Sequence, residues 1–434
     1  MQSRLSSWLS RQPQSVFSIF VIVAAFSTYF AMYAFRKPFA SGTYSGLSLW
    51  GMDYKILLVI VQIFGYTLSK FLGIKIISEM KAGSRIKAIL LLIGIAWLAL
   101  LLFAIVPYPY NFICLFLNGL PLGMIWGIVF SFLEGRRNTE LLGAGLCVSF
   151  IIASGVMKTM GLWWSMKFET WGMTAQQAEF WMPFASGAVF VPMLLAAVWL
   201  LSQVPPPTAE DIASRTKRVP MDGEARRNFV RQFAWGLGFL VAFYILLSIY
   251  RSIRDDFQAE LWDALGYGGK PEIFTLSELP VALVSLLCVG LLFLIKNNRT
   301  AFRTNFLVVA IGCLLTLLAT VGFEAGVVGG AWWIILVGMG LYMPYILFNA
   351  VIFDRMIAVF KTAANVGFLI YLADSFGYLG YVGVQLFRNF GLAELSWLTF
   401  FTNLSYIMGI GGLVLITLAF VYFERKASKF IPKQ

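Results

Sequence analysis

The stretch VFSIFVIVAAFSTYFAMYAF, residues 16–35, has no charged side chain. An apolar run of about 20 residues is long enough for an α-helix to cross the hydrocarbon core of a membrane. Arg4 and Arg11 precede the run and could imitate the start of a signal peptide, but the run is long enough to span. We therefore expect a retained first transmembrane helix.

The rest of the chain repeats this pattern. Hydrophobic residues make up 59% of the 434 residues, charged residues make up 12%, and the mean hydropathy is +0.80, far outside the range of soluble domains. The apolar runs predict an all-α membrane protein with twelve transmembrane helices. We expect these helices at residues 16–36, 54–74, 86–106, 110–133, 141–162, 181–202, 232–254, 272–295, 302–323, 332–356, 363–387 and 399–423.

The longest polar interruption divides these helices into six and six. It covers residues 203–231, opens with three prolines and continues with mixed charge, a composition typical of a solvated linker. A weak repeat agrees, since Tyr29 stands seven residues before Arg36 and Tyr244 stands seven before Arg251. We expect a six-helix bundle at 1–202, a cytoplasmic linker at 203–231 and a pseudo-symmetric second bundle at 232–434.

The net charge of +12 could suggest a nucleic-acid partner, but the basic residues lie in short loops between apolar runs. Their placement instead indicates how the chain is oriented in the membrane. Most of them lie in alternate loops, on one side of the expected membrane. The opposite loops carry only Lys37, Lys55, Lys167, Lys270 and Arg388. The positive-inside rule then predicts two cytoplasmic termini in a multi-pass protein of the inner (plasma) membrane of the cell.

The composition also argues against catalysis. The chain has no histidine, which removes the usual zinc ligand and the usual base of a nucleophilic triad. Its four cysteines lie in apolar runs without CxxC spacing: Cys114, Cys147, Cys288 and Cys313. We expect no metal, no cofactor and no enzymatic activity.

Charges inside membrane spans are costly and mark candidate functional sites. Here they are mostly cations, namely Arg36, Lys70, Lys158, Arg251 and Arg254. Guanidinium groups match phosphate or carboxylate oxygens through paired hydrogen bonds, so the pattern predicts an anionic substrate.

Tyrosines accompany two of these cations at helical spacing. Tyr29 and Tyr33 share a helical face with Arg36, and Tyr66 lies four residues before Lys70. Their hydroxyls can donate hydrogen bonds to substrate oxygens. Each face is therefore a candidate wall of a polar cavity.

Structural roles for these cations stay open. Arg36 and Lys37 could anchor a helix end by extending to lipid headgroups. Arg254 could pair with Asp255 or Asp256, and Lys158 could serve either structure or substrate.

These residues resemble the major facilitator superfamily, and within it the organophosphate:phosphate antiporter family. Four segments carry the resemblance: Tyr33–Phe39, Tyr66–Phe71, Tyr250–Asp256 and Ala363–Gly380. The resemblance implies the major facilitator fold and a phosphate held by Arg36 and Arg251. It also implies that Tyr29, Tyr33, Tyr66, Lys70, Tyr342 and Tyr378 line the binding site.

The chain departs from that family in three places. Ile152 replaces a histidine of the fifth helix, and the signature between the second and third helices is loosened, with Glu79 as its only acid. Asp374 and Glu278 are not accounted for by the family pattern. They could neutralise Arg251 or Lys158, or carry protons.

The resemblance and the cations together predict a secondary active transporter that exchanges a phosphorylated metabolite for inorganic phosphate by alternating access. One alternative is proton-coupled transport of a carboxylate, with Asp374 or Glu278 as the titrating group. Another is an anion sensor with a transporter fold. We expect a monomer in a lipid bilayer, with a small anion as its partner and no nucleic acid.

Overall fold

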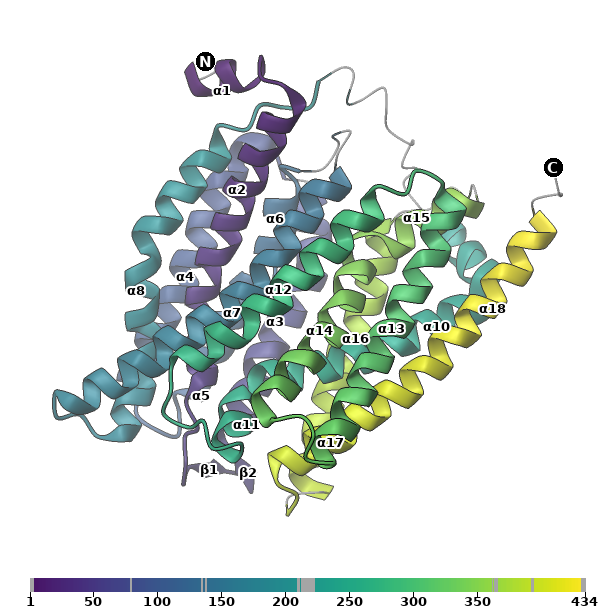
Figure 1. Cartoon of the computed structure of the whole chain (residues 1–434). Helices are drawn as coiled ribbons and strands as arrows, with labels where there is room; N and C mark the ends of the chain where they lie inside the picture. Colours follow the sequence, from purple (N-terminus) through teal and green to yellow (C-terminus); the bar gives the residue numbers. More distant parts are fainter. Residues whose placement is uncertain are drawn as a thin grey trace. The chain divides into compact units, whose positions relative to one another are not determined.

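The computed structural model describes residues 4–78, 80–133, 136, 139–208, 211, 223–360, 362, 366–391 and 394–430. Glu79, much of the expected linker and residues 363–365 of the family segment therefore lie outside the described residues. Figure 1 shows that the described chain is almost entirely helical, with one short hairpin. The first group of elements is α1 (Arg4–Leu9), α2 (Gln14–Met32), η1 (Tyr33–Phe35), η2 (Pro38–Ser41), β1 (Ser48–Leu49), β2 (Met52–Asp53), α3 (Tyr54–Ser78), η3 (Ala82–Ser84), α4 (Arg85–Ile105), α5 (Phe112–Leu122), α6 (Ile125–Phe130), α7 (Thr139–Thr170) and α8 (Ala175–Ser202).

The second group continues the all-helical pattern. It comprises α10 (Gly223–Asp256), α11 (Gln258–Ala264), α12 (Glu272–Phe293), α13 (Asn298–Glu324), α14 (Gly330–Ala350), α15 (Ile352–Phe360), α16 (Val366–Gly391), α17 (Trp397–Tyr406), the π-helical turn η4 (Ile407–Gly411) and α18 (Gly412–Phe430).

Helices that can cross a membrane dominate the described residues. Eleven of these helices are long and apolar enough to do so, counting α5 with α6 and α17 with α18 as one crossing each. The expected eleventh crossing corresponds to α16, a helix of 26 residues that contains Asp374 and is not among those eleven. The chain is thus a multi-pass membrane protein.

The chain forms two compact units. Unit 1 comprises Met1–Ser214, Asp256–Leu276 and Gln385–Ala393, and unit 2 comprises Arg215–Asp255, Ser277–Val384 and Glu394–Gln434. Unit 1 therefore includes α11 and the last turns of α16, which come from the second half of the sequence.

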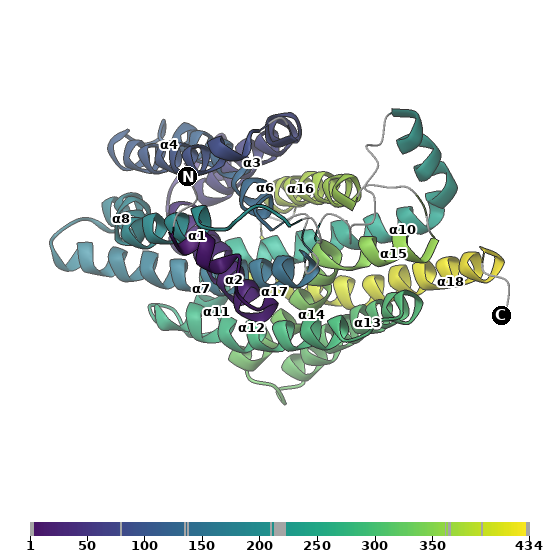
Figure 2. The same ribbon diagram turned by 90° about the horizontal axis from the view of Figure 1, so that it is seen from above.

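Helices α2, α3, α4, α5, α7 and α8 form the body of unit 1, with α2 against α7 and α8, and α5 against α3 and α4. Figures 1 and 2 both show α4 beside α8. The contact between α3 and α5 needs glycine, because a Cβ on Gly119 would lie 2.1 Å from the carbonyl oxygen of Gln62. Backbones can approach this closely only where a side chain is missing.

In unit 2, α13 packs against α14 and α18. Figures 1 and 2 show α13 and α18 side by side. Here too a glycine permits the approach, since a Cβ on Gly340 would lie 2.5 Å from the carbonyl oxygen of Gly312.

Several expected helices are interrupted. The first ends as an α-helix at Met32 and continues as the 3₁₀ turn η1, so Arg36 follows the helix instead of lying within it. Pro38 prevents the helix from resuming in register, because it lacks a backbone N–H and its ring would clash with the carbonyl four residues earlier, that of Ala34. The expected fourth helix is likewise divided at Gly123 and Met124, between α5 and α6.

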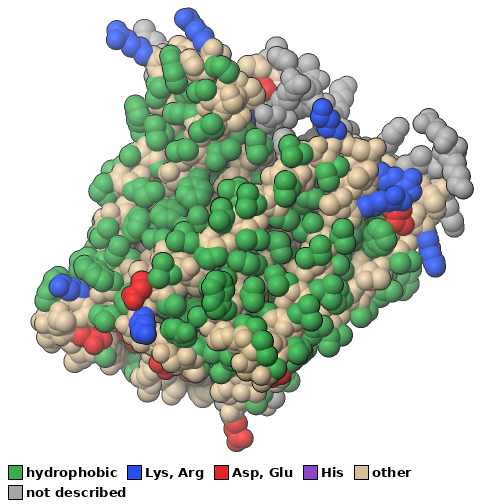
Figure 3. All heavy atoms as spheres, in the orientation of Figure 1, with side chains coloured by type: hydrophobic (Ala, Val, Ile, Leu, Met, Phe, Trp, Pro, Cys, Tyr) green, Lys and Arg blue, Asp and Glu red, His purple; other side chains and the backbone are tan. Residues whose placement is uncertain are grey.

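The outer surface suits a lipid environment. Large apolar side chains are exposed along the helices, among them Leu91, Leu287 and Leu318. On the face drawn in Figure 3, hydrophobic side chains predominate and lysine and arginine side chains lie near helix ends. A soluble monomer rarely exposes apolar surface on this scale.

Candidate functional site

Two buried amides fix the backbone at Arg36. The α-helix has ended here, so the carbonyl groups of Phe35 and Arg36 need partners from outside the helix. Asn118 of α5 donates to the Phe35 carbonyl at 2.8 Å, and Gln62 of α3 donates to the Arg36 carbonyl at 3.2 Å. Gln62 also donates to Asn118 at 2.8 Å, so the two amides act as one clamp.

The Arg36 side chain lies over an aromatic ring. Its guanidinium carbon is 4.0 Å from the centre of the Tyr66 ring, and the Lys70 Nζ is 5.3 Å from the same centre. Both cations are within the range of a favourable cation–π interaction. The rings of Tyr29 and Tyr33 contact edge to face at 5.5 Å. Unit 1 thus contains all five residues that the sequence grouped by helical spacing.

Other cations of unit 1 are bound by acids and an amide. Lys37 is buried and its Nζ lies 2.6 Å from Asp256, while the Lys55 Nζ lies 2.7 Å from Glu260. The alternative that Lys37 extends to lipid headgroups is wrong, because Lys37 ends in this ion pair. Burial raises the pKa of the Glu260 carboxyl, and Lys55 beside it opposes that shift.

Lys158 takes a similar role in unit 1. It is fully buried on α7, and its Nζ donates to the Gln258 side chain. Ser149, another polar residue of α7, donates to the carbonyl of Leu146. The structure therefore gives each of these two side chains a partner within unit 1.

In unit 2, Arg254 forms a buried ion pair with Glu278. Its Nη1 donates to Glu278 at 2.8 Å and its Nη2 donates to the Ile334 carbonyl at 3.2 Å. Arg254 is 1% exposed and Glu278 is 2% exposed. The expected pairing of Arg254 with Asp255 or Asp256 is wrong, because the side chain reaches across to α12.

Arg251 lies three residues earlier on α10 and has different surroundings. It is 9% exposed, its guanidinium carbon lies 4.8 Å from the centre of the Tyr345 ring, and its Nη2 donates to Ser252 at 3.2 Å. Its Nε has no hydrogen-bond partner, and Arg251 forms no ion pair with any residue that the structure describes. Because it lacks the ion pair that compensates a buried charge, Arg251 is the candidate position for an anion in unit 2.

A second polar cluster lies in unit 2. The Tyr244 hydroxyl donates to the Asp374 carboxylate and accepts a hydrogen bond from the Asn349 amide at 3.4 Å. The rings of Tyr244 and Tyr345 stack with centres 6.0 Å apart. Tyr244 is thus a direct partner of Asp374. That Asp374 neutralises Arg251 stays a prediction.

The other two of the five tyrosines implied by the family resemblance are in unit 2. Tyr342 is buried, 5.8 Å from the Arg254 guanidinium carbon, and its ring contacts the Tyr345 ring at 6.3 Å. Tyr378 is buried on α16, four residues after Asp374.

The sequence analysis did not identify Tyr345 and Asn349, which contact Arg251 and Tyr244. Neither stands at a spacing that links it to a charge on its own helix, since their partners Arg251 and Tyr244 are on α10. The sequence analysis named Tyr244 only as part of the internal repeat. That repeat was the available signal for Tyr244 as a candidate site residue, because it pairs Tyr244 with Tyr29 and Arg251 with Arg36.

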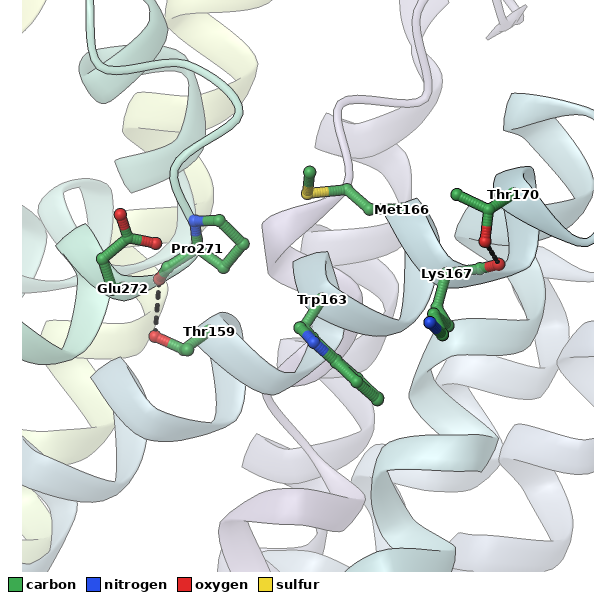
Figure 4. A pocket seen from close by; sticks show the side chains of 7 residues that line it. All are labelled: Thr159, Trp163, Met166, Lys167, Thr170, Pro271 and Glu272. Atoms are coloured by element: carbon green, nitrogen blue, oxygen red, sulfur yellow. Dashed lines mark hydrogen bonds between the residues drawn. The ribbon is translucent and has the colours of Figure 1, made fainter.

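A separate surface pocket contains none of the predicted site residues. Its volume is about 430 Å³, and Figure 4 shows Trp163, Met166 and Lys167 of α7 lining it together with Pro271 and Glu272. Thr159 donates to the Pro271 carbonyl at 2.7 Å. The described residues contain no group of three or more Cys, Asp or Glu side chains that could hold a metal ion.

The fold is similar to that of solved transporters. A D-xylose-proton symporter matches with a TM-score of 0.58 and 14% identity, over 96% of this chain and 98% of that chain. The nucleoside transporter NupG matches with a TM-score of 0.56 and 14% identity, over 94% and 99%. A bacterial homologue of the human drug peptide transporters PepT1 and PepT2 matches with a TM-score of 0.59 and 15% identity, over 94% and 98%.

These identities are low, so the similarity shows the fold and not the substrate. All three structures are transporters of the major facilitator type, and the expected fold is confirmed. No curated protein matches the sequence. A sequence family matches residues 38–426, and the chain therefore belongs to that family, described as a family of unknown function (DUF5690).

Proposed function

We propose that this protein is a secondary active transporter that exchanges a phosphorylated metabolite for inorganic phosphate by alternating access. In this proposal it is a monomer in the inner membrane, with both termini in the cytoplasm. The transporter fold supports the general activity, and the arginines support an anionic substrate.

The buried Arg251 carries the proposal. A guanidinium removed from water is costly unless an anion and hydrogen bonds compensate it. Arg254 has that compensation in its ion pair with Glu278, whereas Arg251 lies over an aromatic ring and has no ion pair among the described residues. A substrate phosphate supplies both the missing charge and acceptors for paired N–H groups.

Arg36 contributes a second guanidinium in this proposal. The ring of Tyr66 beneath it and the amides that fix its backbone limit its conformations, so less entropy is lost when an anion binds. In the proposal, the further donors are Tyr29, Tyr33 and Lys70 of unit 1 and Tyr342 and Tyr378 of unit 2.

The test is counterflow in proteoliposomes loaded with inorganic phosphate. We expect labelled phosphate to exchange with phosphate esters, and Arg251→Ala or Arg36→Ala to slow the exchange at least about 100-fold, as expected for loss of a charged, hydrogen-bonded contact of about 3 kcal/mol. Arg251→Lys keeps the charge but loses the paired hydrogen bonds of the guanidinium group, so its exchange rate should lie between those of the unaltered protein and Arg251→Ala.

Arg303→Ala is the matched control. It removes an arginine from unit 2 whose partner is Glu424 and whose side chain is 50% exposed. Exchange should persist in this variant. Exchange that survives in Arg251→Ala as well would refute the assigned role of Arg251.

Proton-coupled carboxylate transport is the second candidate, with Asp374 as the group that carries the proton, because it is a buried acid without Arg254 as its partner. Glu278 is the weaker choice because its carboxylate is bound to Arg254. Uptake driven by a pH gradient without counter-substrate, and lost in Asp374→Asn, would select this candidate.

A further inference from the structure

The surface pocket between α7 and the start of α12 lies where two membrane crossings end. The apolar span of α7 ends at Thr170, and the span of α12 begins at Glu272. The pocket is therefore at the level where the hydrocarbon core of a bilayer meets the lipid headgroups. Trp163 in the pocket and Trp171 directly after the span are both exposed, and tryptophan is enriched at this interface.

One face of α7 forms most of the pocket wall. The lining residues on this helix follow helical spacing and are Thr159, Trp163, Met166, Lys167 and Thr170. Figure 4 shows them in order along the helix, with Thr159 beside Pro271. Pro271 and Glu272, at the start of α12, form the other wall. All of these residues belong to unit 1, so the pocket is complete within that unit.

Hydrogen bonds hold the two walls together. The Thr159 hydroxyl donates to the Pro271 carbonyl at 2.7 Å and lies 2.7 Å from the Thr275 hydroxyl. The Trp163 ring is restrained by an edge-to-face contact with the Trp164 ring, with ring centres 5.0 Å apart. The pocket is therefore formed before a ligand binds, which reduces the entropy lost on binding.

The pocket combines an apolar surface with one cation and one acid. Trp163 and Met166 are exposed apolar side chains, whereas Lys167 and Glu272 are exposed charges. Neither charge takes part in an ion pair with a residue that the structure describes. At the headgroup level of a bilayer, a ligand that complements this lining has an apolar body, a phosphate for the lysine and an ammonium group for the carboxylate. A phospholipid with a zwitterionic headgroup has all three parts.

Glu272 distinguishes among phospholipid headgroups. An anionic headgroup such as that of phosphatidylglycerol is repelled by the carboxylate. Phosphatidylcholine is zwitterionic, but its quaternary ammonium has no N–H to donate. The primary ammonium of phosphatidylethanolamine donates charge-assisted hydrogen bonds to a carboxylate. The lining of the pocket therefore favours phosphatidylethanolamine.

We propose that this pocket binds one phosphatidylethanolamine molecule, with the phosphate at Lys167, the ammonium group at Glu272 and an acyl chain over Trp163 and Met166. The inference does not depend on the proposed exchange, because none of the residues assigned to the substrate line this pocket. A lysine that only extended toward headgroups in general would not discriminate between these lipids.

Native mass spectrometry of the delipidated full-length protein tests the proposal, with phosphatidylethanolamine, phosphatidylcholine and phosphatidylglycerol of identical acyl chains as probes. We expect phosphatidylethanolamine to bind at least about tenfold more tightly than the other two, as expected for a charge-assisted hydrogen bond. Lys167→Gln should weaken the binding of all three lipids, because each contains the phosphate. Glu272→Gln should make phosphatidylethanolamine and phosphatidylcholine bind equally, and it should strengthen the binding of phosphatidylglycerol because the repulsion is removed.

Two matched controls come from the same end of unit 1. Lys270→Gln removes a neighbouring cation that lies over the Tyr267 ring at 5.5 Å, and Glu169→Gln removes an exposed acid of α7; neither residue lines the pocket. Both control variants should bind the lipids as the unaltered protein does. All four substituted side chains are exposed, so thermal unfolding in lipid-free detergent should be unchanged in every variant.

Equal binding of phosphatidylethanolamine and phosphatidylcholine by the unaltered protein would overturn the inference, as would a preference that persists in Glu272→Gln. A loss of binding in Lys270→Gln as large as that in Lys167→Gln would also overturn it. Free phosphoethanolamine carries both charged groups without an acyl chain, and it should not displace the lipid at equal concentration. Displacement would show that the site takes a soluble phosphate compound and would overturn the lipid assignment.

Discussion

Arg251 and Arg254 are one turn apart on α10, yet their surroundings differ. Arg254 is bound to the Glu278 carboxylate and the Ile334 carbonyl, whereas Arg251 lies over the Tyr345 ring without an ion pair among the described residues. The comparison teaches that burial of a cation does not by itself identify a binding site. An arginine whose charge is neutralised by an ion pair has a structural role, whereas one without an ion pair is a candidate for ligand binding.

The largest effect on stability is expected when the ion pair between Arg254 and Glu278 is broken. Arg254→Met leaves the buried Glu278 without its cation, and we expect a loss of about 3–5 kcal/mol in the free energy of unfolding. Arg251→Met removes a cation that has no ion-paired acid among the described residues, so its stability should change much less than that of Arg254→Met. Thermal unfolding of the detergent-solubilised protein measures both.

The double variant Arg254→Met with Glu278→Met is the control, since it removes both charges and should recover most of the stability lost in Arg254→Met. Equal destabilisation by Arg254→Met and Arg251→Met would contradict the distinction between the two arginines.

A smaller effect concerns Glu260, the acid that neutralises Lys55 in unit 1. Burial raises the pKa of Glu260 above its ordinary value of 4.5, so the folded protein binds this proton more tightly than the unfolded chain does. The associated stability is present below pH 4.5 and is lost as the pH rises through the raised pKa. Glu260→Gln cannot titrate and should give a flatter dependence of melting temperature on pH in that window.

Asp256→Asn serves as the comparison variant, because it removes a different ion-paired acid from the same segment of unit 1. It should keep the slope that Glu260 produces. Identical pH profiles for the unaltered protein and Glu260→Gln would show that Glu260 titrates alike in the folded and unfolded states.

The smallest effect is expected at the exposed pair of Arg303 with Glu424. The Arg303 side chain is 50% exposed, and ion pairs in water contribute about 0–1 kcal/mol. Arg303→Ala should therefore change the melting temperature little, and less in high salt than in low salt. A loss as large as that of Arg254→Met would mean that burial is not what distinguishes these pairs.

The transmembrane helices and the fold could be predicted from the sequence, because apolar length determines which segments cross a membrane. The interruptions were harder to place. Arg36 was expected on a helical face, but the chain leaves α-helical geometry at Met32, and amides from two other helices bind the carbonyl groups of Phe35 and Arg36.

The cations of the candidate site could be identified from the sequence, but their partners could not. Arg254 has two aspartates directly after it, yet it pairs with Glu278 on α12, 24 residues away. Tyr345 beneath Arg251 comes from α14. Such pairings depend on how helices pack, and no local spacing encodes that information.

The clamp of Gln62 and Asn118 has a consequence for the mechanics of unit 1. Because these amides hold the carbonyl groups of Phe35 and Arg36, a force applied to the Arg36 side chain is transmitted to α3 and α5 as well as to α2. An anion bound to Arg36, as proposed, is therefore expected to act on three helices together.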